Sequence, residues 1–165
     1  MTSTLSDDAV DFDSWYTAVR PRLVRTVTAL VRDRAAAEEI CAEAFVRAFG
    51  RWGHVGSEVR DPDAWVFRVA INLARRSWRA RLASPRRLPF DARGDDARTD
   101  HVPDVDLWRL VYALPERQRQ VIVLRYVGDL TESSVADVLG ISTGSVSASL
   151  TKARSSLRAQ LTDHP

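Results

Sequence analysis

The feature that most constrains this chain is an interruption in its middle. Residues 84–103 (SPRRLPFDARGDDARTDHVP) hold three of the seven prolines and almost no apolar side chains. This composition favours a linker, because it offers neither a hydrophobic face nor a regular backbone pattern. The 165 residues are therefore divided into two short halves, each long enough for one very small domain.

Apolar residues on both sides of this linker recur at helical spacing, and neither half shows the sustained alternation typical of a strand. In the N-terminal half the spacing predicts helices over residues 12–31, 34–52 and 63–82. In the C-terminal half it predicts helices over residues 105–113, 115–126, 131–139 and 143–161. We therefore expect an all-α protein of two small helical domains, the first with three helices, joined by a flexible acidic linker.

Several predicted helices carry end signals. Asp61 and Pro62 suit the N-cap and first position of the helix over 63–82, and Thr131 suits an N-cap. Either Ser142 or Thr143 can cap the last helix. Gly140 suits a left-handed helix end.

The two helices on either side of Gly140 are typical of a helix-turn-helix motif. The residues expected to lock them together are Val135, Ala136, Leu139, Ile141, Val146 and Leu150. The second helix would offer outward Ser145, Ser147, Ala148, Ser149, Lys152 and Arg154. In this motif the second helix enters the DNA major groove, and the alternative is an ordinary helical hairpin in a bundle.

The helix over 63–82 is basic along one face. Arg68, Asn72, Arg75, Arg76 and Arg79 recur there at spacings of three and four. With Trp65 and Trp78 nearby and a glycine-containing loop before it, this face suits phosphates and an unstacked base. A solvated arginine face over a packed apolar stripe is the alternative.

The helix over 34–52 combines acids with an apolar side. That apolar side contains Ile40, Ala44, Phe45, Ala48 and Phe49. The glutamates elsewhere on the helix either form a protein-docking face or are simply solvated. Cys41 is expected to be a buried or half-buried thiol, whose pKa the neighbouring acids raise.

The net charge of +2 conceals a segregation of the two signs along the chain. Residues 60–87 carry eight arginines against two aspartates, whereas residues 91–106 carry six aspartates against two arginines. Lys152 is the one lysine among 24 basic residues, a bias that suits phosphate and guanine recognition or reflects a GC-rich genome.

The remaining composition excludes several functions. One cysteine and three scattered histidines give neither a disulfide framework nor a ligand cluster, so we expect no metal and no cofactor. No paired carboxylates, activated nucleophile or glycine-rich phosphate loop stand at usable spacing, so we do not expect an enzyme. The chain has no apolar run long enough to span a bilayer and no signal peptide, so we expect a cytoplasmic protein.

Four stretches together resemble the extracytoplasmic-function (ECF) sigma factors of the sigma-70 family, the small two-domain specificity subunits of bacterial RNA polymerase. AAAEEICAEAFVRAFGRW resembles region 2.2 of the family, and WVFRVAINLARRSWRAR resembles regions 2.3 and 2.4. LPERQRQVIVLRYVGDLT and VADVLGISTGSV resemble region 4. The resemblance implies a tail (1–11), region 2 (12–83), a linker (84–104) and region 4 (105–161).

The resemblance also implies roles for individual residues. The residues implied to dock on the β′ clamp helices of core polymerase are Glu38, Glu39, Glu43 and Arg47. The residues implied to bind the −10 element, including a flipped base, are His54, Val55, Arg68, Asn72, Arg75, Arg76 and Arg79. The residues implied to contact the −35 element are Thr143, Ser145, Ser147, Ala148, Ser149, Lys152 and Arg154. The implied partners are RNA polymerase core through its β′ clamp helices and β flap, promoter DNA, and an anti-sigma factor.

The chain also departs from the family pattern. Two cations usual in the recognition helix are missing from the run Gly144 to Ser149, which predicts a weaker −35 contact with a flatter salt dependence. The loop over 53–61 lacks the aromatic residue that often stacks on the flipped base, and Ala42 replaces the usual glutamine. The alternative function is a stand-alone helix-turn-helix regulator with a helical N-terminal domain.

Overall fold

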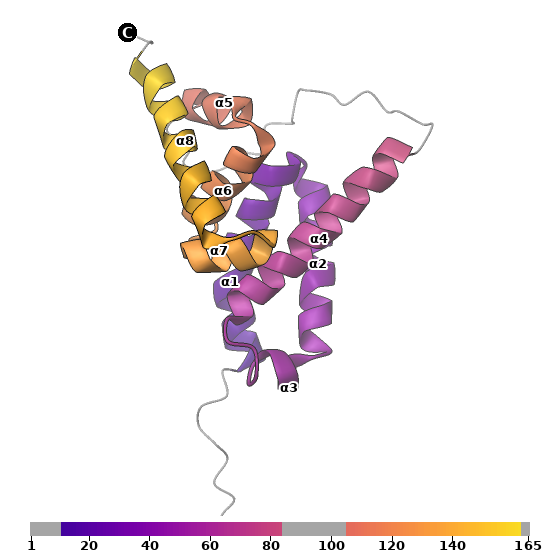
Figure 1. Ribbon diagram of the computed structural model, residues 1–165. Helices are drawn as coiled ribbons and strands as arrows, with labels where there is room; N and C mark the ends of the chain where they lie inside the picture. Colours follow the sequence, from indigo (N-terminus) through magenta and orange to yellow (C-terminus); the bar gives the residue numbers. More distant parts are fainter. Residues whose placement is uncertain (1–10, 84–104, 163–165) are drawn as a thin grey trace, which may run out of the picture.

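The computed structural model describes residues 11–83 and 105–162, with side chains over 11–76 and 107–162 (Figure 1). The described N-terminal domain consists of helices α1 (Phe12–Val31), α2 (Arg34–Phe49), α3 (Trp52–Val55) and α4 (Pro62–Ala83). The described C-terminal domain consists of α5 (Val105–Ala113), α6 (Glu116–Tyr126), α7 (Glu132–Leu139) and α8 (Thr143–Thr162). These ranges contain no strand, so the all-α prediction is confirmed. The linker and the tail expected to be flexible lie outside the described residues.

The predicted helix ends are confirmed where side chains cap them. The Asp61 carboxylate accepts a hydrogen bond from the Ala64 amide at 2.9 Å, and the Thr131 hydroxyl accepts one from the Ser134 amide at 3.1 Å. Ser142, not Thr143, caps α8, since its hydroxyl accepts from the Ser145 amide at 3.1 Å. Gly140 ends α7 with φ of 67°, a left-handed conformation that glycine adopts without a steric penalty.

One predicted helix is wrong in its extent. The helix expected over 34–52 ends at Phe49, and Trp52 begins the separate four-residue helix α3. The turn after Phe49 brings the Trp52 ring against Trp15, with ring centroids 4.7 Å apart, and against Phe12 at 5.1 Å. Burial of these aromatic surfaces outweighs the continuation of α2 by one more turn.

The N-terminal domain is tied together by a carboxylate at the start of α4. Asp63 accepts a hydrogen bond from the Trp15 indole at 2.8 Å and pairs with the Arg22 guanidinium. Both partners lie on α1, whose buried stripe includes Val19 and Leu23. The network therefore fixes the first turn of α4 against α1.

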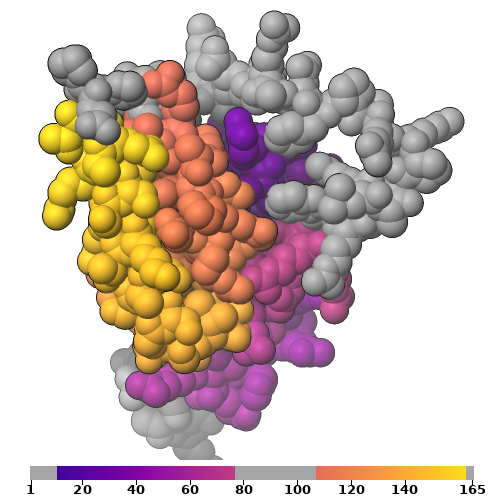
Figure 2. Space-filling model, turned by 45° about the horizontal axis from the view of Figure 1, so that its top comes forward, coloured from indigo at the N-terminus to yellow at the C-terminus, as the bar shows by residue number. Residues whose placement is uncertain are grey.

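The two domains pack directly on each other, an arrangement that the sequence pattern does not predict. Helix α7 lies against α4 and α6 lies against α1, so that one hydrophobic core contains residues of both domains (Figure 1). In the space-filling view the orange and yellow surface of α6 to α8 adjoins the magenta surface of α4 (Figure 2). Gly128 allows this approach, because a Cβ atom there would lie 3.1 Å from the Phe67 ring and 2.6 Å from the Leu124 carbonyl.

Polar contacts also cross the domain boundary. The Ser134 hydroxyl on α7 donates to the second carboxylate oxygen of Asp61 at 2.6 Å. The Arg32 guanidinium lies 4.4 Å from the centroid of the Tyr112 ring. Burial raises the pKa of Tyr112, and the charge of Arg32 opposes this shift. Within the described ranges, no helix has the length and hydropathy needed to cross a bilayer.

Cys41 provides a test of the N-terminal core. The thiol is buried as expected, and burial, more than the neighbouring Glu38, raises its pKa above the ordinary value to about 12. We expect labelling by a thiol-reactive disulfide at pH 8 to be slow in the folded protein and fast after unfolding. The Cys41 thiol loses its proton at a lower pH in the unfolded chain than in the folded chain. Its contribution to the free energy of unfolding should therefore decline as pH rises from about 9 toward 12. Rapid labelling of the folded chain would show that this core is open.

Candidate functional site

The helix-turn-helix geometry is formed by α7, the turn at Gly140 to Ser142, and α8. The residues expected to lock it are buried, except for Ile141, which is half-buried: Val135, Ala136, Leu139, Val146 and Leu150. The N-terminal half of α8 therefore keeps a fixed orientation relative to α7, as a recognition helix requires.

The outward residues of α8 fall on two sides of the helix. Ser145, Ala148, Ser149 and Lys152 are spaced by three or four residues and share one side, with Ser149 half-buried and the others exposed. Thr143, Ser147 and Arg154 are also exposed, but the helical period places them on another side. The residues expected to point outward are therefore exposed or half-buried, but they lie on two sides of α8 and not on one.

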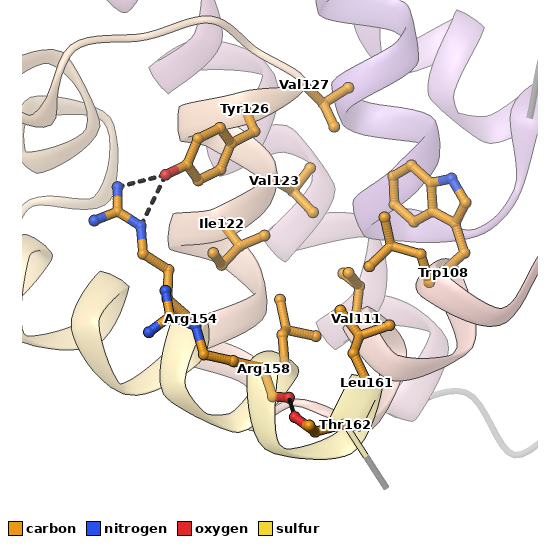
Figure 3. Close-up of a pocket in the computed structure, with 12 residues that line it drawn as sticks. Trp108, Val111, Ile122, Val123, Tyr126, Val127, Arg154, Arg158, Leu161 and Thr162 are labelled. Atoms are coloured by element: carbon orange, nitrogen blue, oxygen red, sulfur yellow. Dashed lines mark hydrogen bonds between the residues drawn. The ribbon is translucent and has the colours of Figure 1, made fainter. Parts of the chain in front are cut away.

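Arg154 is held at a groove in the C-terminal domain. Its guanidinium donates to the Tyr126 hydroxyl from two nitrogens, with the Nε to Oη distance 2.8 Å (Figure 3). The Arg154 side chain thus points toward α6, away from the side of α8 that carries Lys152. We expected Arg154 among the DNA contacts, and the structure does not place it with them.

The groove beside Arg154 lies between α5, α6 and α8 and has a volume of about 600 Å³ (Figure 3). Its apolar lining consists of Leu107, Trp108, Val111, Ile122, Val123, Tyr126, Val127, Leu157 and Leu161. Arg154 and Arg158 lie at its side, and the described residues that line it include no carboxylate. This surface was not predicted from the sequence, although Leu157 and Leu161 continue the apolar spacing of α8 past the helix-turn-helix core.

The basic face of α4 is formed largely as predicted. Arg68, Asn72 and Arg76 are exposed at intervals of four residues, so they follow one another along the helix surface. Arg75 is half-buried beside them. The side chain of Arg79 lies outside the described residues. Three polar groups able to contact a nucleic-acid backbone or base are therefore aligned on one exposed face.

Two residues before α4 were predicted to contact the −10 element, and the structure exposes His54 but not Val55. The His54 ring is exposed, and its Nδ1 lies 2.7 Å from a Glu58 carboxylate oxygen. The prediction that Val55 contacts a base is wrong, because α3 turns its side chain inward and leaves it 0% exposed. The sequence alone suggested an open loop here and did not predict this short helix.

The outward side of α2 carries the predicted charged residues. Glu38, Glu39, Glu43 and Arg47 are all exposed. Arg47 pairs with Glu43 at 2.8 Å and Arg34 pairs with Glu38 at 3.1 Å, in each case one helical turn apart. These pairs add little stability at such exposure, so the charges are available to a partner.

Two apolar residues near the end of α2 are exposed beside these charges. Val46 is 66% exposed and Phe49 is 67% exposed. We expected Phe49 on the buried side, and this prediction is wrong, although its ring contacts Phe12 at 5.1 Å. Exposed large apolar side chains beside paired charges are typical of protein interfaces.

Comparison with known proteins agrees with this geometry. The Sigma-70 region 2 family model matches residues 15–83, and the Sigma-70, region 4 model matches residues 112–159. The RNA polymerase sigma-E factor of Streptomyces avermitilis is 32% identical over 157 residues, which is 93% of this chain and 87% of that protein. The ECF RNA polymerase sigma factor SigW of Bacillus subtilis is 29% identical over 145 residues, which is 77% of this chain and 76% of that protein.

Solved structures show the same fold. The sigma factor RpoE, in its complex with the anti-sigma factor NepR from Bartonella quintana, matches with a TM-score of 0.74 at 20% identity. The match covers 94% of this chain and 99% of that one. The family models and the sequence relatives identify the class as a DNA-binding transcription initiation protein. The chain belongs to the sigma-70 family of RNA polymerase sigma factors, in its ECF group.

Proposed function

We propose that this sigma factor acts in the cytoplasm, carries out no catalysis itself, and gives core RNA polymerase promoter recognition and DNA melting through two separate DNA surfaces. The observation that carries the proposal is the exposed row of Arg68, Asn72 and Arg76 on α4, together with a helix-turn-helix in the other domain. The row binds the melted −10 strand, and His54 flanks the captured base. Binding an extruded base offsets the few kcal/mol that unstacking costs.

Helix α2 docks on the β′ clamp helices in this proposal. Glu38, Glu39, Glu43 and Arg47 supply orienting charges. Val46 and Phe49 supply the apolar area that charged pairs alone cannot provide, since their exposure leaves them free to be buried by a partner.

The groove between α5, α6 and α8 is the corresponding surface for the β flap, because an apolar floor with arginines beside it fits an amphipathic segment with acidic flanks.

Recognition of the −35 element belongs to the side of α8 that carries Ser145, Ala148, Ser149 and Lys152. Thr143 and Ser147 lie near the start of the helix, where they can contact the phosphate backbone. Hydroxyl groups bond to several bases and a methyl group contacts thymine, so these small residues suit a contact of modest affinity. An anti-sigma factor that covers these surfaces is the expected inhibitor. The structural relative RpoE was solved in complex with the anti-sigma factor NepR, and CnrH in complex with the cytosolic domain of CnrY.

The salt dependence of promoter binding tests the −35 assignment. Lys152→Ala should lower the slope of log affinity against log salt concentration by about 0.9, the value for one lost phosphate contact. Arg154→Ala should leave that slope unchanged, because its guanidinium is held by Tyr126. Fluorescence anisotropy of holoenzyme on duplex promoter DNA measures both slopes. Equal slopes for Lys152→Ala and the unaltered chain would remove Lys152 from the interface.

The function as a whole is tested by transcription with purified core RNA polymerase, with and without the protein, on a pool of random promoter fragments that is sequenced afterwards. We expect enrichment of a two-part motif whose downstream part is melted. Retention of duplex fragments by the protein alone, with no polymerase binding, would instead establish a stand-alone regulator.

A further inference from the structure

The stretch LPERQR (114–119) forms the turn between α5 and α6 and the first turn of α6. Leu114 is buried and anchors this turn in the core. Its amide donates to the Val111 carbonyl at 3.2 Å, but Pro115 has no amide proton to give to the next carbonyl group. The carbonyl groups at the end of α5 therefore need a donor from outside that helix.

Arg119 supplies that donor from α6. Its Nη1 atom donates to the Tyr112 carbonyl at 3.1 Å and to the Leu114 carbonyl at 3.2 Å. The guanidinium thus lies at the carbonyl end of α5, where the helix dipole favours a positive charge. Arg119 is half-buried, which limits competition from water for these bonds. One side chain of α6 therefore fixes the end of α5.

The angle between α5 and α6 sets the shape of the apolar groove. Leu107, Trp108 and Val111 of α5 line one side of it, and Ile122 and Val123 of α6 line another (Figure 3). Helix α5 has nine residues, too few for a helix that is stable by itself in water. Its position therefore depends on the contacts that hold its end and its buried face.

We infer that Arg119 is a positioning residue for polymerase binding, which fixes α5 relative to α6 and thereby keeps the groove in the shape that takes the β flap. The inference rests on the proposed function, since it assumes that the groove binds the β flap. Arg119 is not among the residues that line the groove, so it acts through the α5 carbonyl groups and not by contact with polymerase. Molecules in which the end of α5 is released have an incomplete groove, and apparent affinity falls with the fraction that keeps it complete.

Two variants separate the hydrogen bonds of Arg119 from the rest of its side chain. Both bonds come from one nitrogen, so Arg119→Lys can restore them with its single ammonium group. Arg119→Met keeps a flexible apolar stem but has no donor. Arg117→Met is the matched control, since Arg117 is the exposed arginine two residues earlier on the same helix. Circular dichroism melting confirms that each variant is folded.

Amide hydrogen exchange of the full chain reports how firmly α5 is held. Arg119→Met should speed exchange of the α5 amides about tenfold, because the loss of bonds to a charged donor makes local opening easier. Exchange in α7 and α8 should not change. Arg119→Lys and Arg117→Met should both exchange like the unaltered chain.

Titration with core RNA polymerase, intact or with the flap segment deleted from its β subunit, measures the effect on binding. We expect Arg119→Met to weaken binding to intact polymerase about tenfold, while Arg119→Lys and Arg117→Met bind like the unaltered chain. On the flap-deleted polymerase all four proteins should bind alike, since docking through α2 remains. A general loss of folding would instead weaken binding to both polymerases.

Unchanged α5 exchange in Arg119→Met would show that Arg119 does not hold the end of α5. Faster exchange with unchanged affinity for intact polymerase would show that polymerase binding does not depend on this hold. Equal losses in Arg119→Lys and Arg119→Met would show that the two bonds from Nη1 are not what the position requires. If flap deletion leaves binding of the unaltered chain unchanged, the proposed function of the groove fails, while amide exchange still decides whether Arg119 holds α5.

Discussion

Asn72→Ala combined with Arg76→Ala should abolish promoter opening while the protein still binds core polymerase. Both side chains are exposed on α4 and point away from the buried positions of that helix, so their loss leaves the fold intact. Each contact with a base or the backbone of a melted strand contributes about 1–3 kcal/mol. Removing two should reduce open-complex formation about 100-fold. Permanganate footprinting of the holoenzyme measures opening, and co-purification with core polymerase measures docking.

The matched control for this prediction is Arg25→Ala, which removes an exposed arginine from α1. It lowers the net charge without touching the α4 face, so opening should be unchanged. Opening by the double variant at the level of the control would remove α4 from the melting mechanism, whatever the binding data show.

Phe67→Ala should lower the free energy of unfolding by about 3–5 kcal/mol, the usual cost of emptying a fully buried aromatic site. Phe67 is among the largest fully buried side chains, and its ring faces both the N-terminal core and Gly128 of the C-terminal domain. The cavity would therefore weaken one domain and its contact with the other. Urea unfolding monitored by circular dichroism measures the change.

Phe49→Ala makes the same chemical change at an exposed position of α2 and serves as the control. It should cost less than about 1.5 kcal/mol, the upper range for a single aromatic pair such as its contact with Phe12. A loss of similar size in both variants would mean that Phe67 is not the centre of a shared core.

The sequence was sufficient for those parts of the fold that depend on local interactions. Helical periodicity, capping side chains and the left-handed Gly140 act within a few residues, so the helices and the helix-turn-helix could be located. The boundary at Phe49 could not, because it depends on Trp52 reaching the rings of Phe12 and Trp15. Tertiary packing outweighed local periodicity at that point.

The candidate site was partly predictable for the same reason. The spacing of Arg68, Asn72 and Arg76 defines a face whatever surrounds the helix. The burial of Val55 and the exposure of Phe49 depend on which neighbours cover each residue, and periodicity does not reveal those neighbours. The apolar groove and the contact between the domains combine residues from distant parts of the chain, and no single segment contains their signal.

The two oxygens of Asp61 also matter for how such a protein can change by mutation. A single nucleotide substitution converts an aspartate codon into an asparagine codon, and asparagine caps a helix as well as aspartate does. The amide would keep the start of α4 but replace a charged acceptor facing Ser134 by a neutral group, with about half the bond strength. The contact between α4 and α7 can therefore change in strength through a single substitution that leaves the start of α4 capped.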